Sequence, residues 1–329
     1  MAKPNPLRPF TPNPEMMALR PAVTGDELNG VGETEVRRPR MMFWAPDPDD
    51  IAFGEVQRWF YQHETPEPDR LALRAKRRVM MEAPLPELAP VAVDQSPQEW
   101  TAALQEFIDA GDCERIGVTP LQPQWVFDHQ TTEFKTVLVL GVQHDYEKLK
   151  WAPQAVAGTD VVRQYTRAAT AAKKITGWLR QQGWDAEAAT GPMVGKILMI
   201  PAAIAAGFGE LGKHGSIINP EFGSAFRLSA VLTNAPLEAT PPRSFGIDDF
   251  CTRCRVCEDA CPPEAISPQK KTVRGDLKWS VNFDLCIPFF AETSGCAICI
   301  AVCPWSRPGV GLNLAEKLAR RAVHKGAPA

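Results

Sequence analysis

Eight of the nine cysteines lie between residues 251 and 303 of this 329-residue chain. The first four, in "CTRCRVCEDACP", follow the spacing C-x2-C-x2-C-x3-C-P, and the second four repeat it with a wider first gap. This is the spacing of bacterial ferredoxins, in which three thiolates of a run bind one [4Fe–4S] cluster and the fourth binds the other. The pattern predicts two clusters, one held by Cys251, Cys254, Cys257 and Cys303, the other by Cys261, Cys286, Cys296 and Cys299.

Two other uses of clustered cysteines fit this pattern less well. Disulfide scaffolds are short secreted chains, whereas a long cysteine-poor body precedes this motif. Structural zinc sites use paired C-x2-C knuckles with a longer spacer, and often histidine. Cys113 stands alone in "AGDCERIGV", and we expect it to be a buried apolar thiol.

Composition restricts the partners and the compartment. The net charge is −3 and no long Lys/Arg run is present, which argues against nucleic acid as the main partner. No apolar run reaches the roughly 18 residues of a membrane helix, and no secretory signal is visible. The paired arginines of "RRPRMMFW" (37–44) lack a following apolar segment, so we interpret them as a loop. The expectation is a cytoplasmic protein, or an exported, membrane-associated one whose twin-arginine signal has been removed.

Local patterns divide the chain into three regions. Prolines concentrate early, so residues 1–95 are expected to be a Pro-rich, extended region with few regular elements. In residues 96–245, a helix over 96–111 has Ser96 as N-cap and Glu99 completing a capping box. Strands are predicted at 115–121, 135–142 and 226–234, and a helix at 159–184. Residues 195–215 are predicted to form a second, more buried helix that breaks into a glycine-rich loop. These elements indicate an α+β fold, followed by a ferredoxin-like domain and tail at 246–329 that closes with a helix over 311–323.

Two familiar cofactor motifs are missing from the middle region. No G-x-G-x-x-G follows a strand, because "GFGELG" (207–212) comes after a helical pattern; nicotinamide is not predicted, and flavin stays open. There is also no D-x-H-x-x-G, whose histidine coordinates cobalt from below in one class of corrinoid enzymes.

The segment before the cysteines resembles a known family. "AGFGELGKHGSIINPEFGSAFRLSAVLTNAPLE" (206–238) is similar to the pattern of the reductive dehalogenases, which runs AGLGELGR-x-G, P-E-Y/F-G, R-L and T-D/N-x-P ahead of F-C-x2-C-x2-C-x3-C-P. "QYTRAATAA" (164–172) resembles that family's Y-S-R-M-A helix start. The resemblance covers roughly residues 130–305. It implies a nitroreductase-like α/β core that binds base-off cobalamin, with a ferredoxin-like domain carrying two [4Fe–4S] clusters.

The resemblance also implies an activity and its residues. The family are oxidoreductases that cleave a carbon–halogen bond of an organohalide with reduced cobalamin, Co(I), in organohalide respiration among other settings. By position in the motifs, Tyr165 would donate the proton and Arg227 would steady its phenolate, since a fixed cation lowers the pKa of a tyrosine. Phe222, Phe226 and Trp151 are candidate pocket residues, and the cluster of Cys261 is expected to be the one beside the corrin. The implied cobalamin contacts are Lys213, His214, Gly215, Ser216, Pro220, Phe222, Gly223, Thr233 and Asn234.

Two alternatives and several partners complete the hypothesis. Epoxyqueuosine reductase, a tRNA-modifying relative, shares "GKH" and "EFGS", but its acidic proton donor falls on Ala189 and its loop tryptophan before G-K is absent. A ferredoxin-type electron-transfer protein is the other alternative. The partners implied are an organohalide, an external donor (ferredoxin, flavoprotein or quinol-linked) and a small membrane-anchor subunit, without nucleic acid.

Overall fold

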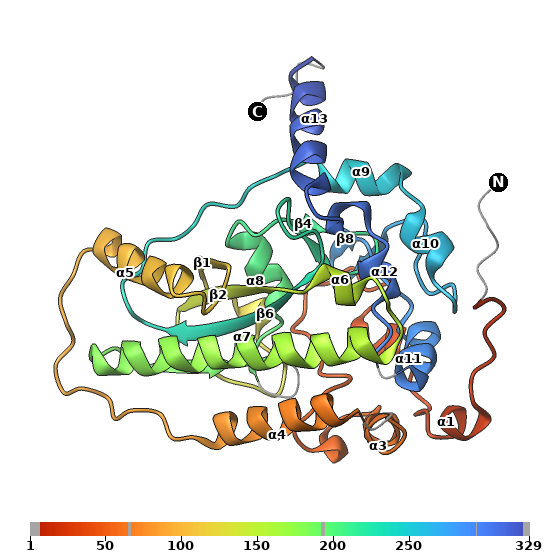
Figure 1. Ribbon diagram of the computed structural model, residues 1–329, viewed down its shortest axis with the longest axis horizontal. Helices are drawn as coiled ribbons and strands as arrows, with labels where there is room; N and C mark the ends of the chain where they lie inside the picture. The colour runs from red at the N-terminus through yellow and green to blue at the C-terminus, as the bar shows by residue number, and fades with distance from the viewer. Residues whose placement is uncertain (1–6, 65–66, 192–194, 294, 325–329) are drawn as a thin grey trace.

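A four-stranded antiparallel sheet forms the centre of the computed structural model, which describes residues 7–64, 67–191, 195–293 and 295–324. Its strands are β1 (Arg115–Pro120), β2 (Thr136–Gln143), β6 (Phe226–Thr233) and β3 (Ala186–Ala189), in the order β1-β2-β6-β3. The long helix α7 (Ala155–Gln181) crosses one face, and α8 (Met199–Ala205) packs on the other (Figure 1). The prediction of an α+β fold is confirmed.

Burial on both faces explains why β2 reads as a continuous apolar run. Leu138, Leu140 and Val142 pack with α7 and with α5 (Pro97–Asp109), whereas Val137 and Val139 pack with α8. Successive side chains of a strand point to opposite faces, so both sets must be apolar. The predicted capping box of α5 is present, because Ser96 Oγ accepts from Glu99 N while Glu99 accepts from Ser96 N.

The segment 195–215 contains the predicted buried helix, which is short, and the glycine-rich part after it forms a hairpin that the sequence did not predict. Only Met199–Ala205 is helical, and the chain then forms a small hairpin of β4 (Glu210–Leu211) and β5 (Ile217–Ile218). Gly207 and Gly209 have φ values of 73° and 152°, which helices do not tolerate. A Cβ on Gly209 would lie 1.9 Å from the carbonyl oxygen of Ile218, so the hairpin requires glycine there.

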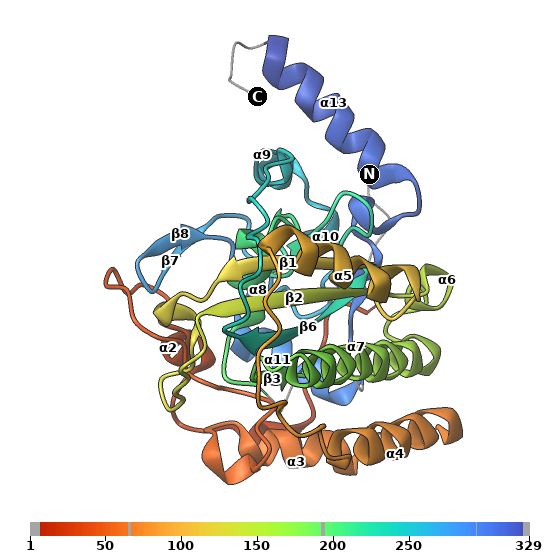
Figure 2. The same ribbon diagram turned by 90° about the vertical axis from the view of Figure 1, so that its left-hand side faces the viewer.

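The N-terminal region is more regular than its prolines suggest, and the expectation of few regular elements is wrong. Prolines begin helices here because they fit the first helical turn. The buried side chains of α3 pack against α11 (Phe283–Glu292) of the cysteine region, and α4 packs along the outer side of α7 (Figure 2). The elements are α1 (Pro14–Ala18), α2 (Gly25–Asn29), η1 (Pro48–Asp50), α3 (Gly54–Gln62) and α4 (Pro68–Glu82).

Short elements present the cysteines, and the last helix leaves the body of the molecule. The helix α13 (Val310–His324) projects outward in both views (Figures 1 and 2), in the place where the sequence predicts a closing helix. Among the residues that are described, no helix is long and apolar enough to cross a membrane. The remaining elements are η2 (Pro123–Trp125), α6 (Tyr146–Leu149), α9 (Ile247–Arg253), α10 (Val256–Ala260), β7 (Lys271–Val273), β8 (Asp276–Lys278), α11 (Phe283–Glu292), α12 (Ile298–Ala301) and η3 (Pro304–Ser306).

Gly223 joins the core to the cysteine region, and Gly223→Ala should be strongly destabilising. Its φ is 60°, and an added Cβ would lie 2.3 Å from the backbone of Ser306. Gly309 is the matched control, because its φ is +74° with nothing within 4 Å of an added Cβ. Gly309→Ala should lower the free energy of unfolding by about 1–2 kcal/mol through backbone strain alone. Gly223→Ala should lower it by a further ~1–3 kcal/mol through overlap. Equal losses in anaerobic denaturant unfolding would contradict this contact.

Candidate functional site

A cavity of about 650 Å³ lies where the core, the N-terminal region and the cysteine loops meet. Helix α7 and the start of β6 form one wall, α3 and α4 a second, and the loops around α11 and α12 a third. Volumes of this size are typical of small-molecule and cofactor sites. All three predicted regions therefore contribute to one site.

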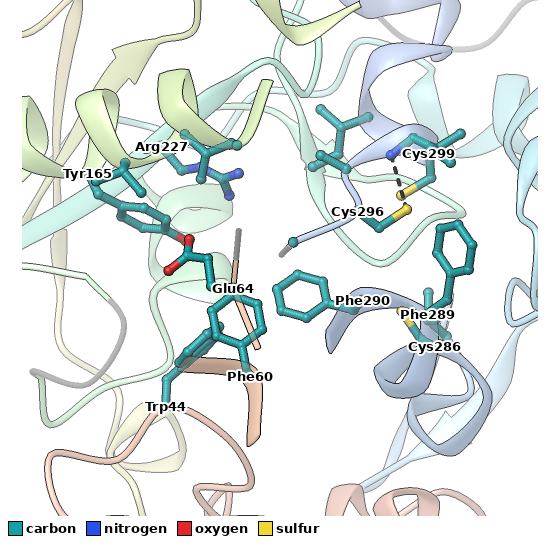
Figure 3. Close-up of a pocket in the computed structure, with 18 of the residues that line it drawn as sticks. Trp44, Phe60, Glu64, Tyr165, Arg227, Cys286, Phe289, Phe290, Cys296 and Cys299 are labelled. Atoms are coloured by element: carbon teal, nitrogen blue, oxygen red, sulfur yellow. Dashed lines mark hydrogen bonds between the residues drawn. The ribbon is translucent and has the colours of Figure 1, made fainter. Parts of the chain in front are cut away.

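Tyr165 and Arg227 come together at one end of this cavity. Tyr165 projects from α7, and Arg227 is the second residue of β6. The guanidinium carbon of Arg227 lies 4.8 Å from the centroid of the Tyr165 ring. Arg227 Nε is buried and has no hydrogen-bond partner among the described residues. Figure 3 shows both side chains directed into the same space. The pair that the resemblance implied is thus adjacent in space.

His144 lies close enough to Arg227 for their charges to interact. Its Nδ1 is 2.9 Å from Asp160 Oδ2, which connects the end of β2 to α7. Burial lowers the pKa of His144 to about 4, Arg227 lowers it further, and the hydrogen bond with Asp160 opposes both effects. His144 is therefore neutral near pH 7 and adds no second positive charge beside Arg227.

Four cysteines line the opposite end of the same cavity. They are the set that the spacing assigns to one cluster, and they come from the end of α10, from α11, from the loop before α12 and from α12 itself. In Figure 3 the aromatic rings of Phe60 and Phe290 lie between the Tyr165 end and the labelled thiols. The four cysteines are Cys261, Cys286, Cys296 and Cys299.

The other four cysteines line a separate, much smaller cavity together with Lys213 and His214. They are Cys251, Cys254, Cys257 and Cys303, the set that the spacing assigns to the other cluster. Burial raises the pKa of Cys251 to about 11, and that of Cys257 and Cys303 to about 12. Iron is bound by the thiolate, so loading these sites must release protons. Within the described ranges, no three His, Cys, Asp or Glu side chains converge on a single-ion site. The thiols instead surround two spaces.

The "GELGK" segment supports the first cysteine run. Glu210 accepts hydrogen bonds from Gly246 N and Asp248 N, both at 3.0 Å, and also from Phe245 N. These amides lie at the N-terminus of α9, the helix that carries Cys251, and a carboxylate is favourable there. Lys213 donates to Cys254 O at 2.9 Å and pairs with Glu258. The motif thus fixes the loop that carries Cys251 and Cys254.

His214 lines both cavities, and both of its ring nitrogens are engaged. Nδ1 accepts from Ser216 N at 3.2 Å, and Nε2 lies 3.1 Å from Ser224 Oγ. Ser224 gives its own proton to Ile217 O, so Nε2 is the donor to Ser224. Burial lowers the pKa of His214 to about 4, in agreement with a neutral ring. Neither nitrogen is available to coordinate a metal.

Of the implied cobalamin contacts, only His214 lines the large cavity. Thr233 and Asn234 lie at the opposite end of β6 from Arg227, where the Thr233 hydroxyl donates to Asp185 O and Asn234 Oδ1 accepts from Lys135 N. Phe222 packs in the core on the α8 side, and Lys213 faces the smaller cavity. The others that lie outside the lining of the large cavity are Gly215, Ser216, Pro220 and Gly223.

The candidate pocket residues Phe222, Phe226 and Trp151 are also misplaced. Phe222 and Phe226 are buried in the core, and the Trp151 residue is 52% exposed. The aromatic wall comes instead from Trp44, Phe60 and Tyr61 of the N-terminal region and from Phe289 and Phe290 of α11.

Sequence reasoning missed the whole N-terminal contribution to the site. Besides its aromatic wall, this region supplies Arg74, Arg77 and Met81, which line the cavity from α4. Their helical spacing after Pro68, which begins a helix, was the available signal. The loose family likeness of this region gave no reason to place it beside Tyr165.

Comparisons with known proteins agree with this architecture. A family model described as "4Fe-4S dicluster domain" matches residues 250–306, which confirms the two-cluster prediction. The tetrachloroethene reductive dehalogenase of Dehalobacter restrictus is 33% identical over 62% of this chain, a match that covers 39% of the relative. The epoxyqueuosine reductase of Synechococcus sp. (strain CC9605) is 30% identical, with 74% of this chain and 78% of the relative covered. The chain thus spans about two fifths of the length of the dehalogenase.

Solved structures extend the likeness to the fold. The catabolic reductive dehalogenase NpRdhA superposes with a TM-score of 0.73 at 22% identity, covering 92% of this chain and 46% of that one. At that identity the match shows the fold alone, and it includes the N-terminal region that the sequence motifs did not reach. The chain therefore belongs to the group of related iron–sulfur proteins that includes the epoxyqueuosine reductases and the reductive dehalogenases, and it shares the fold of the latter.

Proposed function

We propose that this protein reductively removes halide from an organohalide, using cobalamin in the large cavity and electrons from its two clusters. One observation carries the proposal. A tyrosine–arginine pair and one complete set of cluster cysteines line the same cavity from opposite ends. A proton source and an electron source thereby reach a common space.

The residues around the cavity fit a base-off corrinoid. Of the described residues that line it, His214 is the only histidine, and its hydrogen bonds engage both ring nitrogens. No lining histidine is therefore free to coordinate cobalt from below. Gly158 and Val161 of α7, Pro262 and Ile298 would hold the ring system together with His214. When bound, the corrinoid would supply a reduced cobalt that breaks the carbon–halogen bond.

The chain's own groups supply the rest of the reaction. The overall change converts R–X, two electrons and a proton into R–H and X⁻. We assign the proton to the Tyr165 hydroxyl and the stabilisation of the resulting phenolate to Arg227, whose guanidinium lies over the ring. The thiolates of Cys261, Cys286, Cys296 and Cys299 would hold the cluster that opens onto the cavity. The electrons come from an external low-potential donor, and a small membrane-anchor subunit stays part of the proposal.

Epoxyqueuosine reduction is the second candidate, because the Synechococcus relative matches over most of its length. The sequence argues against it at the position of that family's acidic proton donor. Ala189 occupies the position and is buried at the end of β3, and the carbonyl of the next residue, Thr190, accepts from Arg77. No carboxylate stands at this point to protonate an epoxide.

The two functions are separated by their products. The cobalamin- and cluster-loaded protein, with reduced viologen as the donor, would be given halogenated aromatic and aliphatic compounds in one series and an epoxyqueuosine-bearing tRNA in another. Halide release from the first series, with the tRNA unchanged, is expected. Conversion of the tRNA without halide release would transfer the assignment to the second candidate.

A further inference from the structure

Lys213 is almost completely buried beside the cysteines of one cluster. The residue is 2% exposed, and it lines the smaller cavity together with Cys251, Cys254, Cys257 and Cys303. Lysine is rarely buried, because removing an ammonium group from water is costly unless other groups compensate for the lost hydration. The groups that compensate for it therefore decide where this positive charge lies.

Three groups hold the ammonium in a fixed place. Lys213 Nζ donates to Cys254 O at 2.9 Å and pairs with the carboxylate of Glu258. The same nitrogen lies 5.1 Å from the centroid of the Trp279 ring. That ring is itself held, because Trp279 Nε1 donates to Asp248 Oδ1 at 2.8 Å. The charge of Lys213 is therefore fixed against the loop that carries the first cysteines.

The positive charge of Lys213 acts on the cysteine sulfurs. Burial raises the pKa of Cys251 to about 11 and that of Cys257 to about 12, and the Lys213 ammonium opposes this effect at both thiols. Glu258 does not line the cavity, so the positive member of the ion pair is the one that faces the thiols. A charge that favours a thiolate also favours any other negative charge added at that place.

The same electrostatics apply to an iron–sulfur cluster. Its reduction potential depends on nearby charge, on hydrogen bonds to its sulfurs and on its exposure to solvent. An electron taken from an external donor makes the cluster more negative, so a fixed buried cation stabilises the reduced form. Salt screens a buried charge only weakly, so the effect should persist at physiological ionic strength.

A cation also reaches the other set of cysteines, but it is more exposed. Arg8 donates to Cys261 O at 2.9 Å, its side chain is 27% exposed, and it also pairs with Glu264. Solvent screens such a charge more strongly than that of Lys213. A change of charge at Lys213 should therefore alter the potential of one cluster and leave the other almost unchanged.

We propose that Lys213 sets the reduction potential of the cluster bound by Cys251, Cys254, Cys257 and Cys303, because its fixed buried charge stabilises the reduced form. Lys213 thus has a redox role in place of the cobalamin contact that the family motif implied. The inference goes beyond the proposed function, and it holds whichever substrate receives the electrons.

An anaerobic redox titration of the protein reconstituted with its clusters and cobalamin, followed by electron paramagnetic resonance, tests the inference without a substrate. Cys257→Ala, which should lack this cluster, identifies its signal. Lys213→Gln removes the charge and keeps a hydrogen-bond donor. At a fixed potential it should lower the ratio of reduced to oxidised cluster at least about tenfold, a midpoint shift of about 59 mV to more negative potential. Lys213→Arg keeps the charge and should restore most of the unmodified ratio.

Two further variants serve as controls. Lys270 is the matched lysine, because its ammonium lies 5.4 Å from the centroid of the same Trp279 ring but is 28% exposed and outside the cavity lining. Lys270→Gln should change the ratio by less than about twofold, as expected for a screened charge. Glu258→Gln removes the counter-charge of Lys213 and should raise the ratio. Because it leaves Lys213 in place, this variant decides the question if Lys213→Gln does not assemble its cluster.

Three outcomes would overturn the inference. The first is an unchanged ratio in Lys213→Gln with its full iron content. The second is an equal shift in Lys213→Gln and Lys213→Arg, which would show a purely structural role, and the third is a lowered ratio in Glu258→Gln. Because the titration needs no substrate, a failure to release halide from any organohalide would count against the proposed function alone.

Discussion

Replacing Tyr165 by phenylalanine is expected to lower halide release by at least about 100-fold, the usual contribution of a positioned general acid. The substitution removes only the hydroxyl, and the ring stays under the Arg227 guanidinium 4.8 Å from its centroid. Packing and cofactor binding should therefore be preserved. Steady-state halide release is the measurement, with iron and cobalamin contents determined on the same sample.

Tyr146→Phe is the matched control for this loss. Tyr146 lies on α6 outside the lining of the cavity, and its hydroxyl donates to Ala301 O at 3.3 Å. This variant should keep its halide release within a factor of about two, because one weak hydrogen bond is lost away from the site. Full activity of Tyr165→Phe would remove the tyrosine from the reaction and leave the source of the proton to another group.

The second large effect concerns Cys261. In the sequence this residue belongs to the first cysteine run, but it lines the large cavity together with Cys286, Cys296 and Cys299. Cys261→Ala is expected to eliminate the cluster that faces Tyr165 and, with it, essentially all halide release. Electron paramagnetic resonance of the reduced protein can follow each cluster. The spectrum of Cys261→Ala should match that of Cys296→Ala, because both variants lose a ligand of the same cluster.

Two reference variants make this result decisive. Cys257→Ala should lose the other cluster, and Cys113→Ala should lose neither, since Cys113 is buried in the core beside α5 and α7. A spectrum of Cys261→Ala that matched Cys257→Ala would contradict the crossed ligand assignment.

Local signals predicted most of the core. The capping box at Ser96, the apolar strand over 135–142 and the long helix over 159–184 all have the expected structure, because each depends on short-range chemistry. The division of the eight cysteines into two sets also follows from short-range sequence information, since the spacing of a ferredoxin run already specifies crossed ligands. Tyr165 and Arg227 are candidates proposed from motifs, and only the fold could show that α7 and β6 bring them together.

What the sequence could not show depends on contacts between distant segments. Arg77 and Trp44 reach the cavity because α4 packs on α7 and the N-terminal region packs on α11, and both contacts join segments that are far apart in the sequence. Thr233 was expected in the site because it belongs to the same motif as Arg227. A strand advances about 3.3 Å per residue, so the length of β6 carries Thr233 away from the cavity.

The central claim is that the large cavity is a cobalamin site between a cluster and Tyr165. The most direct test is the cofactor content after anaerobic reconstitution with iron, sulfide and cobalamin, followed by gel filtration. About eight iron atoms per chain should be retained together with cobalamin in stoichiometric amount, and the absorption spectrum of the bound corrinoid should be that of the base-off form. Retention of the iron without any cobalamin would contradict the account and leave a protein that only transfers electrons.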